Sequence, residues 1–196
     1  MGRNHVFLIR HGETEWSKSG QHTGGTNLPL TEAGMEQGRL LTDRLKGIEF
    51  ATVLTSPLQR AMETCRQADL LHRAEVLDEL REWDYGAYEG LTTPEIWRQR
   101  ADWSIWMHGA PQGESPEQVA ERADRVLERA RTADGDVALF SHGHMLRAVG
   151  ARWLGLPVAA GQHLMLSTAS VSVLGYERET PVIRLWNGRA HLSQFT

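Results

Sequence analysis

The stretch HVFLIRHG, residues 5–12, joins a short apolar, β-branched run to an arginine, a histidine and a glycine. An apolar run that ends abruptly in polar residues is typical of a buried strand that leads into a loop. The stretch DVALFSHGH, residues 136–144, repeats this pattern and ends in Ser141, His142 and Gly143. The two stretches therefore predict two buried strands, each of which delivers polar side chains at its C-terminal end.

Helical and strand-like patterns alternate along the rest of the chain. Further strands are expected at residues 51–55, 164–176 and 181–186, and a short strand is expected within residues 75–80. Helices are expected at residues 31–47, from Ser56 and Pro57 onward with Pro57 in the first turn, at 94–102, at 116–131 and up to Trp153. Loops are expected at residues 13–29, 81–91 and 103–116, with a polar tail after Asn187.

This alternation indicates crossovers between parallel strands and predicts a three-layer α/β/α sandwich with a mainly parallel central sheet. In such folds ligands bind beyond the C-terminal ends of the strands. The length of 196 residues fits a single domain, with residues 83–116 as a small cap over the site. A chain of this length buries roughly 70% of its unfolded surface, so a sizeable core is expected.

The composition excludes several classes of protein. The 21 basic and 25 acidic side chains give a net charge of −4 without a clustered basic field, so neither nucleic acid nor an anionic membrane is an expected partner. Cys65 is the single cysteine, which excludes a disulfide framework and a thiolate zinc cage. No apolar run approaches the ~18 residues of a membrane span, and no signal-peptide pattern is present, so a cytoplasmic location is expected.

Arginines and histidines gather at the ends of three predicted strands, namely Arg10 with His11, Ser56 with Arg60, and His142 with Gly143. A single residue of this kind is often a histidine bonded to a carbonyl or an arginine on the surface. Because an unpaired buried charge is costly, a cluster of cationic groups at one sheet edge requires a partner, and the simplest partner is an anion. Guanidinium groups contact a tetrahedral phosphate in a bidentate manner. The sequence therefore predicts a phosphate site.

Three stretches and one acidic residue carry a resemblance to a known family. They are LIRHGETEW at residues 8–16, SPLQRAMET at 56–64, SHG at 141–143, and Glu82. In this order and spacing they resemble the histidine phosphatase superfamily, which is also called phosphoglycerate mutase-like, over nearly the whole chain. The resemblance implies that His11 is a nucleophile that forms a phosphohistidine, that Arg10, Arg60 and His142 hold the phosphoryl oxygens, and that Glu82 is the general acid and base.

Elementary chemistry agrees with this assignment. A histidine attacks phosphorus only when it is neutral, and the positive charges of Arg10 and Arg60 disfavour the cationic form of His11. The same charges stabilise the transition state of phosphoryl transfer, so neither a metal nor another cofactor is expected. A metal-ligand pair of His142 and His144 is disfavoured because no nearby carboxylate cluster completes a coordination sphere.

Ser17 departs from the asparagine that is usual in the superfamily after the Glu-Trp pair. Together with the runs at residues 14–24, 80–90 and 142–147, it is similar to a narrower branch of fungal sedoheptulose-1,7-bisphosphatases and mycobacterial mutase-like acid phosphatases, in which serine is expected. The substrate implied is a small phosphorylated metabolite such as a sugar phosphate or bisphosphate, with inorganic phosphate as a product. Candidate substrate contacts are Ser17, Lys18, Gln21, His22, Thr23, Gly24, Tyr85, Gly143 and Arg147.

Several alternatives remain open at this point. Arg147, with Lys18, Gln21 and His22, could grip a second phosphate, or Arg147 could be a surface residue paired with a carboxylate. A cofactor-dependent phosphoglycerate mutase is disfavoured because the family's mutases carry an adjacent arginine pair where this chain has residues 98–100, Arg-Gln-Arg. A module that only binds phosphate esters or phosphoproteins is disfavoured because all five core positions are present. A homodimer is possible through an exposed apolar strand at residues 170–174.

Overall fold

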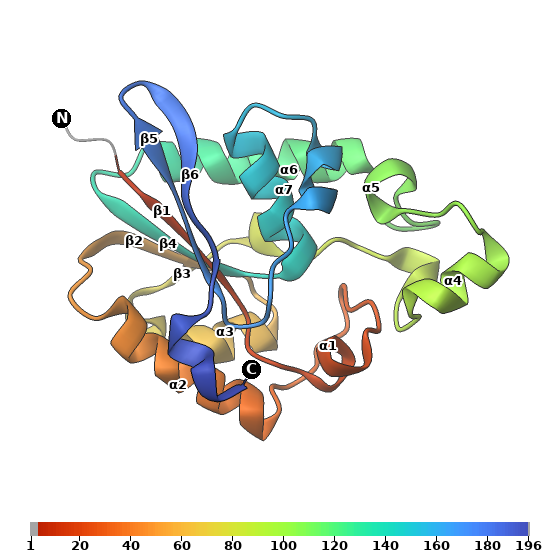
Figure 1. Cartoon of the computed structure of the whole chain (residues 1–196), viewed down its shortest axis with the longest axis horizontal. Helices are drawn as coiled ribbons and strands as arrows, with labels where there is room; N and C mark the ends of the chain where they lie inside the picture. The colour runs from red at the N-terminus through yellow and green to blue at the C-terminus, as the bar shows by residue number, and fades with distance from the viewer. Residues whose placement is uncertain (1–3, 196) are drawn as a thin grey trace.

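The computed structural model describes residues 4–195 and shows a mixed α/β fold built on a six-stranded sheet (Figure 1). Residues 1–3 and 196, which the predicted domain includes, lie outside the described part. The strands are β1 (Val6–Arg10), β2 (Phe50–Thr55), β3 (Glu75–Val76), β4 (Asp136–Ser141), β5 (Val171–Glu177) and β6 (Thr180–Gly188). Their order in the sheet is β3-β2-β4-β1-β5-β6.

Most neighbouring strands run in parallel. β3, β2, β4 and β1 form parallel pairs, whereas β5 is antiparallel to both β1 and β6. β1 pairs with β4 in a register that sets Arg10 opposite Ser141, so the residues that follow, His11 and His142, leave the sheet side by side. The predicted mainly parallel sheet is confirmed, and the two histidine stretches meet at one edge.

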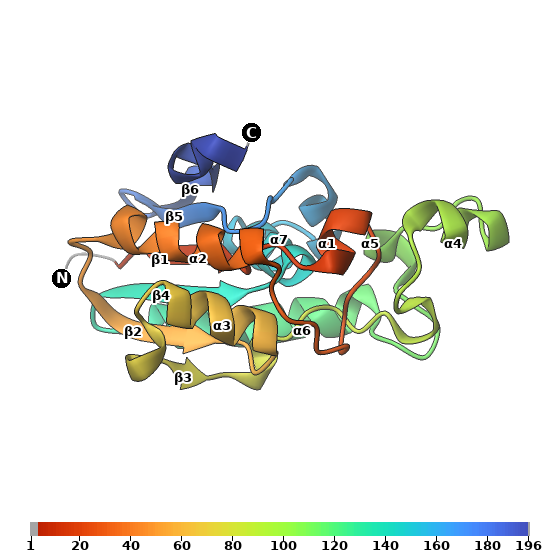
Figure 2. The same ribbon diagram turned by 90° about the horizontal axis from the view of Figure 1, so that it is seen from below.

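Helices cover both faces of the sheet, with α2 and α3 on one face and α6 and α7 on the other (Figures 1 and 2). The helices are α1 (Glu15–Ser19), α2 (Glu32–Leu45), α3 (Gln59–Gln67), α4 (Thr93–Gln99), α5 (Ile105–His108), α6 (Pro116–Arg131) and α7 (Gly143–Trp153). Short 3₁₀ helices lie at Leu71–Arg73, Asp78–Leu80, Gly86–Tyr88, Val158–His163 and Ala190–Phe195. The predicted three-layer sandwich is confirmed.

Each face of the sheet has its own apolar cluster. Successive strand residues point to opposite faces, so Leu8 joins the cluster under α6 and α7 and Ile9 joins the cluster under α2 and α3. Leu139 and Phe140 of β4 divide in the same way. The continuous apolar runs of β1 and β4 are therefore explained by burial on both faces.

Helix α6 matches the range predicted from its amphipathic period, and its local chemistry explains both ends. Ser115 accepts a hydrogen bond from the backbone N–H of Gln118 and Gln118 caps Ser115 in return, while Pro116 occupies the first turn. Arg129 and Arg131 lie in the last turn, where cationic side chains favour the helix C-terminus.

Several predicted boundaries were wrong for local reasons. The loop at 13–29 contains α1, because Thr14 and Ser17 form a capping box. The loop at 103–116 contains the single turn α5. The helix expected to hold Pro57 in its first turn begins at Gln59, with Leu58 as its N-cap. The short strand predicted within residues 75–80 is confirmed as the two residues of β3, which a 3₁₀ turn follows.

The C-terminal part differs most from the prediction. The strand expected at 164–176 begins at Val171, because residues 158–163 form a 3₁₀ helix and residues 164–170 an irregular segment. The polar tail forms a 3₁₀ helix whose Leu192 is buried in the cluster under α2. Segment 170–174, expected as an exposed strand that pairs across a dimer, lies between β1 and β6 with Val171 and Leu174 fully buried. This strand has no free edge, so it cannot support the dimer prediction.

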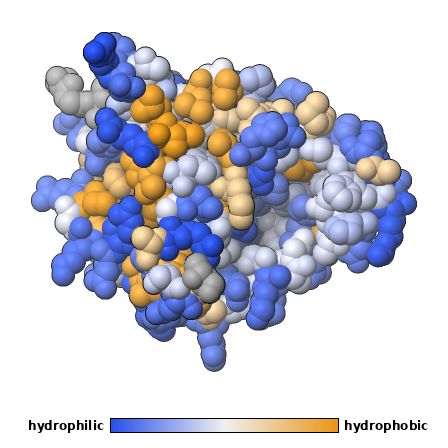
Figure 3. Space-filling model, viewed as in Figure 1, coloured by the Kyte–Doolittle hydropathy of each residue, from blue (hydrophilic) through white to orange (hydrophobic). Residues whose placement is uncertain are grey.

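Helices α4 and α5 lie beyond the end of the sheet that carries His11 (Figures 1 and 2). On the face that Figure 3 shows, hydrophobic residues gather on the side of β5 and β6, whereas the part around α4 is mainly hydrophilic. Within residues 4–195, no helix combines the length and apolar character that a membrane crossing requires.

Substitution of a residue in the central strand tests the two-faced core. Leu139 is fully buried in the cluster under α6 and α7. We expect Leu139→Ala to lower the free energy of unfolding by about 2–5 kcal/mol, because the truncation leaves a cavity between sheet and helices. Leu156→Ala, at a side chain that is 43% exposed, is the matched control and should change stability by less than about 1 kcal/mol. Urea denaturation measures both; equal losses would contradict the assignment of the core.

Candidate active site

A cavity of about 180 Å³ lies beyond the C-terminal ends of β1 and β4. It is lined by Arg10, His11, Trp16, Ser17, Gly20, Gln21, His22, Thr23, Glu82, Tyr85, Gly143, His144, Arg147 and Leu166. The structure thus brings ten of the predicted site residues to one cavity, namely Arg10, His11, Ser17, Gln21, His22, Thr23, Glu82, Tyr85, Gly143 and Arg147. Four others lie elsewhere, namely Arg60, His142, Lys18 and Gly24.

His11 is fixed in one orientation at the end of β1. Its backbone N–H donates to the Ser141 carbonyl at 2.9 Å, which continues the strand pairing by one residue. Its Nδ1 lies 2.7 Å from the Gly12 carbonyl oxygen. Because a carbonyl only accepts, Nδ1 carries the proton, and in the neutral ring Nε2 holds the lone pair. The ring therefore offers a nucleophilic nitrogen at the cavity wall.

The surroundings keep His11 neutral. Burial, followed by the positive charges of Arg60 and Arg10, holds the pKa of His11 well below its usual 6.5. The Gly12 hydrogen bond acts in the opposite direction but is the smaller cause. The neutral form that nucleophilic attack requires is therefore the stable form of this ring at neutral pH.

Arg60 and His142 lie behind His11 and do not line the cavity. Arg60 is fully buried; its Nη1 donates to the Thr26 carbonyl and its Nη2 to the carbonyls of Thr23 and Gly24. These bonds fasten loop 23–26 to α3. The predicted contact of Arg60 and His142 with phosphoryl oxygens stays a prediction.

His142 is held as a neutral ring by its two partners. Arg60 Nε donates to Nδ1 of His142 at 3.0 Å, so in the neutral ring Nε2 carries the proton and donates to Ser56 Oγ at 2.8 Å. Burial and the charge of Arg60 lower the pKa of His142 well below 6.5. The ring lies 5.2 Å from His11, centroid to centroid, and supports it without adding a second positive charge.

Arg10 presents an unused donor at the site. Its Nη1 donates to the Leu166 carbonyl at 2.5 Å, while among residues 4–195 its buried Nε finds no hydrogen-bond partner. A Cβ at Gly143 would lie 3.3 Å from Cζ of Arg10, which is tighter than ordinary contact. Glycine at 143 thus allows the guanidinium to lie against the start of α7. A buried N–H without a partner is rare in folded proteins, which makes Arg10 Nε a candidate donor to a ligand.

Glu82 is held by the N-terminus of α7. Its Oε1 accepts from the backbone N–H groups of Trp83 and Met145, both at 2.9 Å, and its Oε2 accepts from that of His144 at 3.0 Å. The first N–H groups of a helix have no partner within the helix, and a carboxylate satisfies them well. The carboxylate therefore lies at a fixed place on the wall that it shares with His11.

The outer wall of the cavity is aromatic and carries neutral imidazoles. His144 Nδ1 lies 2.5 Å from the Tyr85 hydroxyl, and His22 Nε2 lies 3.1 Å from Thr93 Oγ1. The His22 ring lies 4.7 Å from the Tyr85 ring. Burial lowers the pKa of His22 to about 4, and burial with the charge of Arg147 lowers that of His144 well below 6.5. This wall can donate and accept hydrogen bonds without charge.

Of the side chains predicted to bind a second phosphate, Arg147, Gln21 and His22 line the cavity and Lys18 does not. Arg147 lines the cavity and lies over the Trp106 ring at 4.7 Å, with Nε and Nη2 donating to the carbonyls of Gly161 and Gln162. It is therefore neither free on the surface nor paired with a carboxylate, as the alternative supposed. Lys18 is exposed and does not line the cavity.

Two candidate contacts have other partners in the structure. The Ser17 hydroxyl accepts from the N–H of Thr14 and donates to its carbonyl, so it caps α1 while it lines the cavity. The N–H of Gly24 donates to the Glu89 carboxylate, so this group is already occupied and does not serve the predicted contact of Gly24 with the substrate. The anion at this glycine is a side chain of the same protein.

Four cavity residues are not among the site residues predicted from the sequence. They are Trp16, Gly20, His144 and Leu166. In the sequence His144 is singled out only as a metal-ligand candidate, although its place two residues after His142, at the start of a helix, is a signal for the cavity wall. Leu166 lies in an irregular segment that was expected to be a strand, so its contribution could not be foreseen. Within the described residues there is no group of three or more histidine, cysteine or carboxylate side chains that could hold a metal ion.

Comparisons with known proteins agree with this geometry. The family model of the histidine phosphatase superfamily (branch 1) matches residues 6–189. An acid phosphatase of Mycobacterium tuberculosis is 46% identical over 180 residues, which cover 89% of this chain and 88% of the relative. A sedoheptulose 1,7-bisphosphatase of Saccharomyces cerevisiae is 37% identical over 189 residues, which cover 78% and 68%. The solved structure of an open reading frame of M. tuberculosis superposes with a TM-score of 0.90 at 40% identity, covering 94% of this chain and 97% of that one.

The neutral state of His22 makes stability depend on pH. Between pH 6.5 and about 4 the folded protein leaves His22 neutral while the unfolded chain takes up a proton. Because the unfolded state binds more protons, the free energy of unfolding falls as the pH falls through this range, by at most about 1.4 kcal/mol per pH unit for one histidine. We expect His22→Asn to reduce this slope in urea titrations. Near pH 8 the difference in free energy of unfolding between the wild type and the variant reports packing alone. An unchanged slope would contradict the assignment of His22 as neutral in the folded protein.

Proposed function

The chain belongs to the histidine phosphatase superfamily, and we propose that it hydrolyses small phosphate monoesters through a phosphohistidine at His11, without a metal. The observation that carries the proposal is the neutral His11 ring, whose Nδ1 proton is held by Gly12 and whose Nε2 lone pair lies beside the cationic groups. The phosphatase names of the relatives agree with this reaction.

In the first step Nε2 of His11 forms a bond to phosphorus while the bond from phosphorus to the ester oxygen breaks. Glu82 gives its proton to that oxygen, so the leaving group departs as an alcohol rather than as an alkoxide. The positive charge that His11 acquires lies on a ring whose Nδ1–H already donates to Gly12. Position and electrostatics supply most of what this transfer needs.

In the second step the Glu82 carboxylate takes a proton from water. The water oxygen bonds to phosphorus, the bond from phosphorus to Nε2 breaks, and inorganic phosphate leaves. His11 returns to its neutral form and Glu82 is again protonated, so the cycle balances. The fixed position of Glu82 at the α7 N-terminus allows it to serve both steps from one place.

Charge at the reacting phosphoryl group is balanced by groups already present. Arg10 offers its free Nε–H to one oxygen, and the start of α7 at Gly143 faces the same cavity with the positive end of its dipole. Arg60 does not line the cavity but donates to the buried His142, and its positive charge acts on the site from there. Such preorganised donors act most strongly where water is excluded.

We propose that the substrate is a sugar phosphate or bisphosphate, with residues 83–116 as the cap. Neutral hydrogen-bonding groups on His22, His144 and Tyr85 suit hydroxyl groups, and Arg147 provides a charge on the same wall. Arg98 and Arg100, the positions compared with the arginine pair of mutases, are exposed and do not line the cavity. Because the cavity lacks the adjacent arginine pair that the mutases carry, transfer to water is favoured over return to the substrate.

Removal of the nucleophile tests the reaction. We expect p-nitrophenyl phosphate to be hydrolysed at the same rate with and without EDTA, and His11→Ala to lose at least about 10³-fold in kcat because the covalent route is closed. His72→Ala, at an exposed histidine, is the control and should retain activity. Phosphate binding without turnover in the wild type would favour a binding module, and inhibition by EDTA would indicate a metal enzyme.

Arg147 tests the choice of substrate. We expect Arg147→Ala to lower kcat/KM for a sugar bisphosphate about 30-fold or more, the equivalent of roughly 2–3 kcal/mol for one lost charged hydrogen bond, and to change that for the corresponding monophosphate far less. Arg152→Ala removes an arginine of the same helix that pairs with Asp124 outside the cavity, and it should leave both values unchanged. An equal loss for both substrates would rule out a distal phosphate contact.

A further inference from the structure

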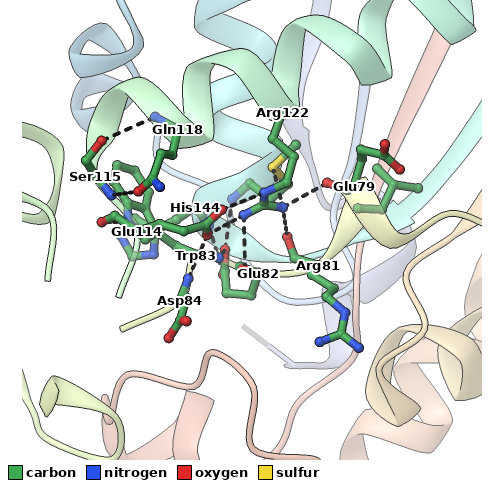
Figure 4. Close-up of polar contacts among 12 residues, drawn as sticks. Glu79, Arg81, Glu82, Trp83, Asp84, Glu114, Ser115, Gln118, Arg122 and His144 are labelled. Atoms are coloured by element: carbon green, nitrogen blue, oxygen red, sulfur yellow. Dashed lines mark hydrogen bonds and ion pairs between the residues drawn. The ribbon is translucent and has the colours of Figure 1, made fainter. Parts of the chain in front are cut away.

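Arg122 of α6 is only 9% exposed and lies outside the active-site cavity. Its guanidinium spans the space between α6 and the segment that carries Glu82 (Figure 4). A buried guanidinium is expensive unless nearly all of its donors are satisfied. The partners of these donors therefore indicate what Arg122 does.

Three of the partners are backbone carbonyls of the short segment 79–82. Nη1 donates to the carbonyls of Glu79 at 2.8 Å and Arg81 at 2.6 Å, and Nη2 donates to the carbonyl of Glu82 at 3.2 Å (Figure 4). The carboxylate of Glu82 is bound separately by the N-terminus of α7. Glu82 is thus held at both ends, its main chain by Arg122 and its side chain by α7.

Glu114 completes this arrangement. Its carboxylate accepts from Arg122 Nε at 2.8 Å and Nη2 at 2.6 Å in a bidentate pair, and Oε2 also accepts from the N–H of Asp84 at 2.9 Å. Its backbone carbonyl accepts from Nε1 of Trp83 at 3.0 Å. Residues 82–84 are therefore fastened at three successive positions, to Arg122 within α6 and to Glu114 just before that helix.

The donors of Arg122 are used differently from those of Arg10. Each nitrogen of the Arg122 guanidinium donates to a group of the protein, and Nη1 also lies 3.4 Å from Sδ of Met145. Arg10 keeps a buried Nε–H without a partner among the described residues and lines the active-site cavity. Arg10 is arranged to bind an anion, whereas Arg122 is arranged to hold the chain.

We propose that Arg122, with Glu114, is a positioning residue that sets the place of Glu82 for its two proton transfers. The inference rests on the proposed function, because it assigns Glu82 the acid and base role. Arg122 does not touch His11 or the cavity, so its loss leaves the nucleophile in place. If Glu82 is misplaced, the rate falls most for substrates whose leaving group needs a proton to depart.

The test compares leaving groups. Nitrophenolate departs without a proton, whereas the alkoxide of an alkyl phosphate needs one. For Arg122→Lys we expect kcat/KM to fall about 10-fold or more for glycerol phosphate and less than about 3-fold for p-nitrophenyl phosphate, because kcat/KM reports the step in which the leaving group departs. Arg125→Lys is the matched control, since Arg125 lies on the same helix and faces Glu79 at 3.7 Å but is 54% exposed; both values should stay unchanged.

Chemical rescue gives a second measurement. A cavity of about 290 Å³ lies against Arg122, Glu114 and Glu82, and it is open to solvent because the exposed residues Asp78 and Arg81 also line it. We expect methylguanidinium to restore glycerol phosphate turnover by Arg122→Ala, whereas sodium chloride at equal ionic strength does not. Absence of rescue in a folded variant would count against the proposal.

The outcomes separate this inference from the function on which it rests. A wild type without turnover refutes the proposed function. Turnover in the wild type with equal losses for both substrates in Arg122→Lys, or with no loss, refutes the positioning role and leaves the function standing. If neither Arg122 variant folds, as judged by circular dichroism, Glu114→Gln decides: a selective loss with glycerol phosphate supports the role, and an equal or absent loss overturns it.

Discussion

Parallel pairing of β1 with β4 places His11 and His142 beside each other at the edge of the sheet where the active-site cavity lies. The register that sets Arg10 opposite Ser141 also lets the His11 N–H continue the ladder to the Ser141 carbonyl. A shift by one residue would turn every side chain of β1 to the other face and separate Leu8 and Ile9 from their clusters. The apolar packing on both faces thus fixes the position of His11.

Arginine side chains lie around His11 and His142, and backbone carbonyls of the protein accept hydrogen bonds from them. Arg60 is bound to three carbonyls of loop 23–26, and the Glu89 carboxylate holds the N–H groups of Gly24 and Thr26 in the same loop. The loop therefore links a buried cation to a carboxylate without a direct ion pair. The cost of burying Arg60 is offset by these bonds, while its field still lowers the pKa of His11 and His142.

The sequence sufficed for the sheet, its layers and the inner half of the site, because these depend on continuous apolar runs and on short motifs at strand ends. Helix α6 was predicted to the residue, since its caps and its period are local. The arrangement of the outer wall of the cavity could not be predicted from such local patterns. The pairing of His144 with Tyr85, the burial of His22 and the use of the Gly24 N–H by Glu89 depend on contacts between distant segments. Short helices such as α1 and α5 were missed because a single capped turn carries no periodicity.

The hydrogen bond from Nδ1 of His11 to Gly12 also decides which regioisomer of the proposed phosphohistidine can form. With Nδ1 occupied, phosphorus can attach only to the remote nitrogen of the ring, which yields the tele isomer of phosphohistidine and excludes the pros isomer. Reagents that discriminate the two isomers would therefore see a chemically homogeneous species. The orientation of one peptide carbonyl thus imposes regiochemistry on an otherwise ambident imidazole.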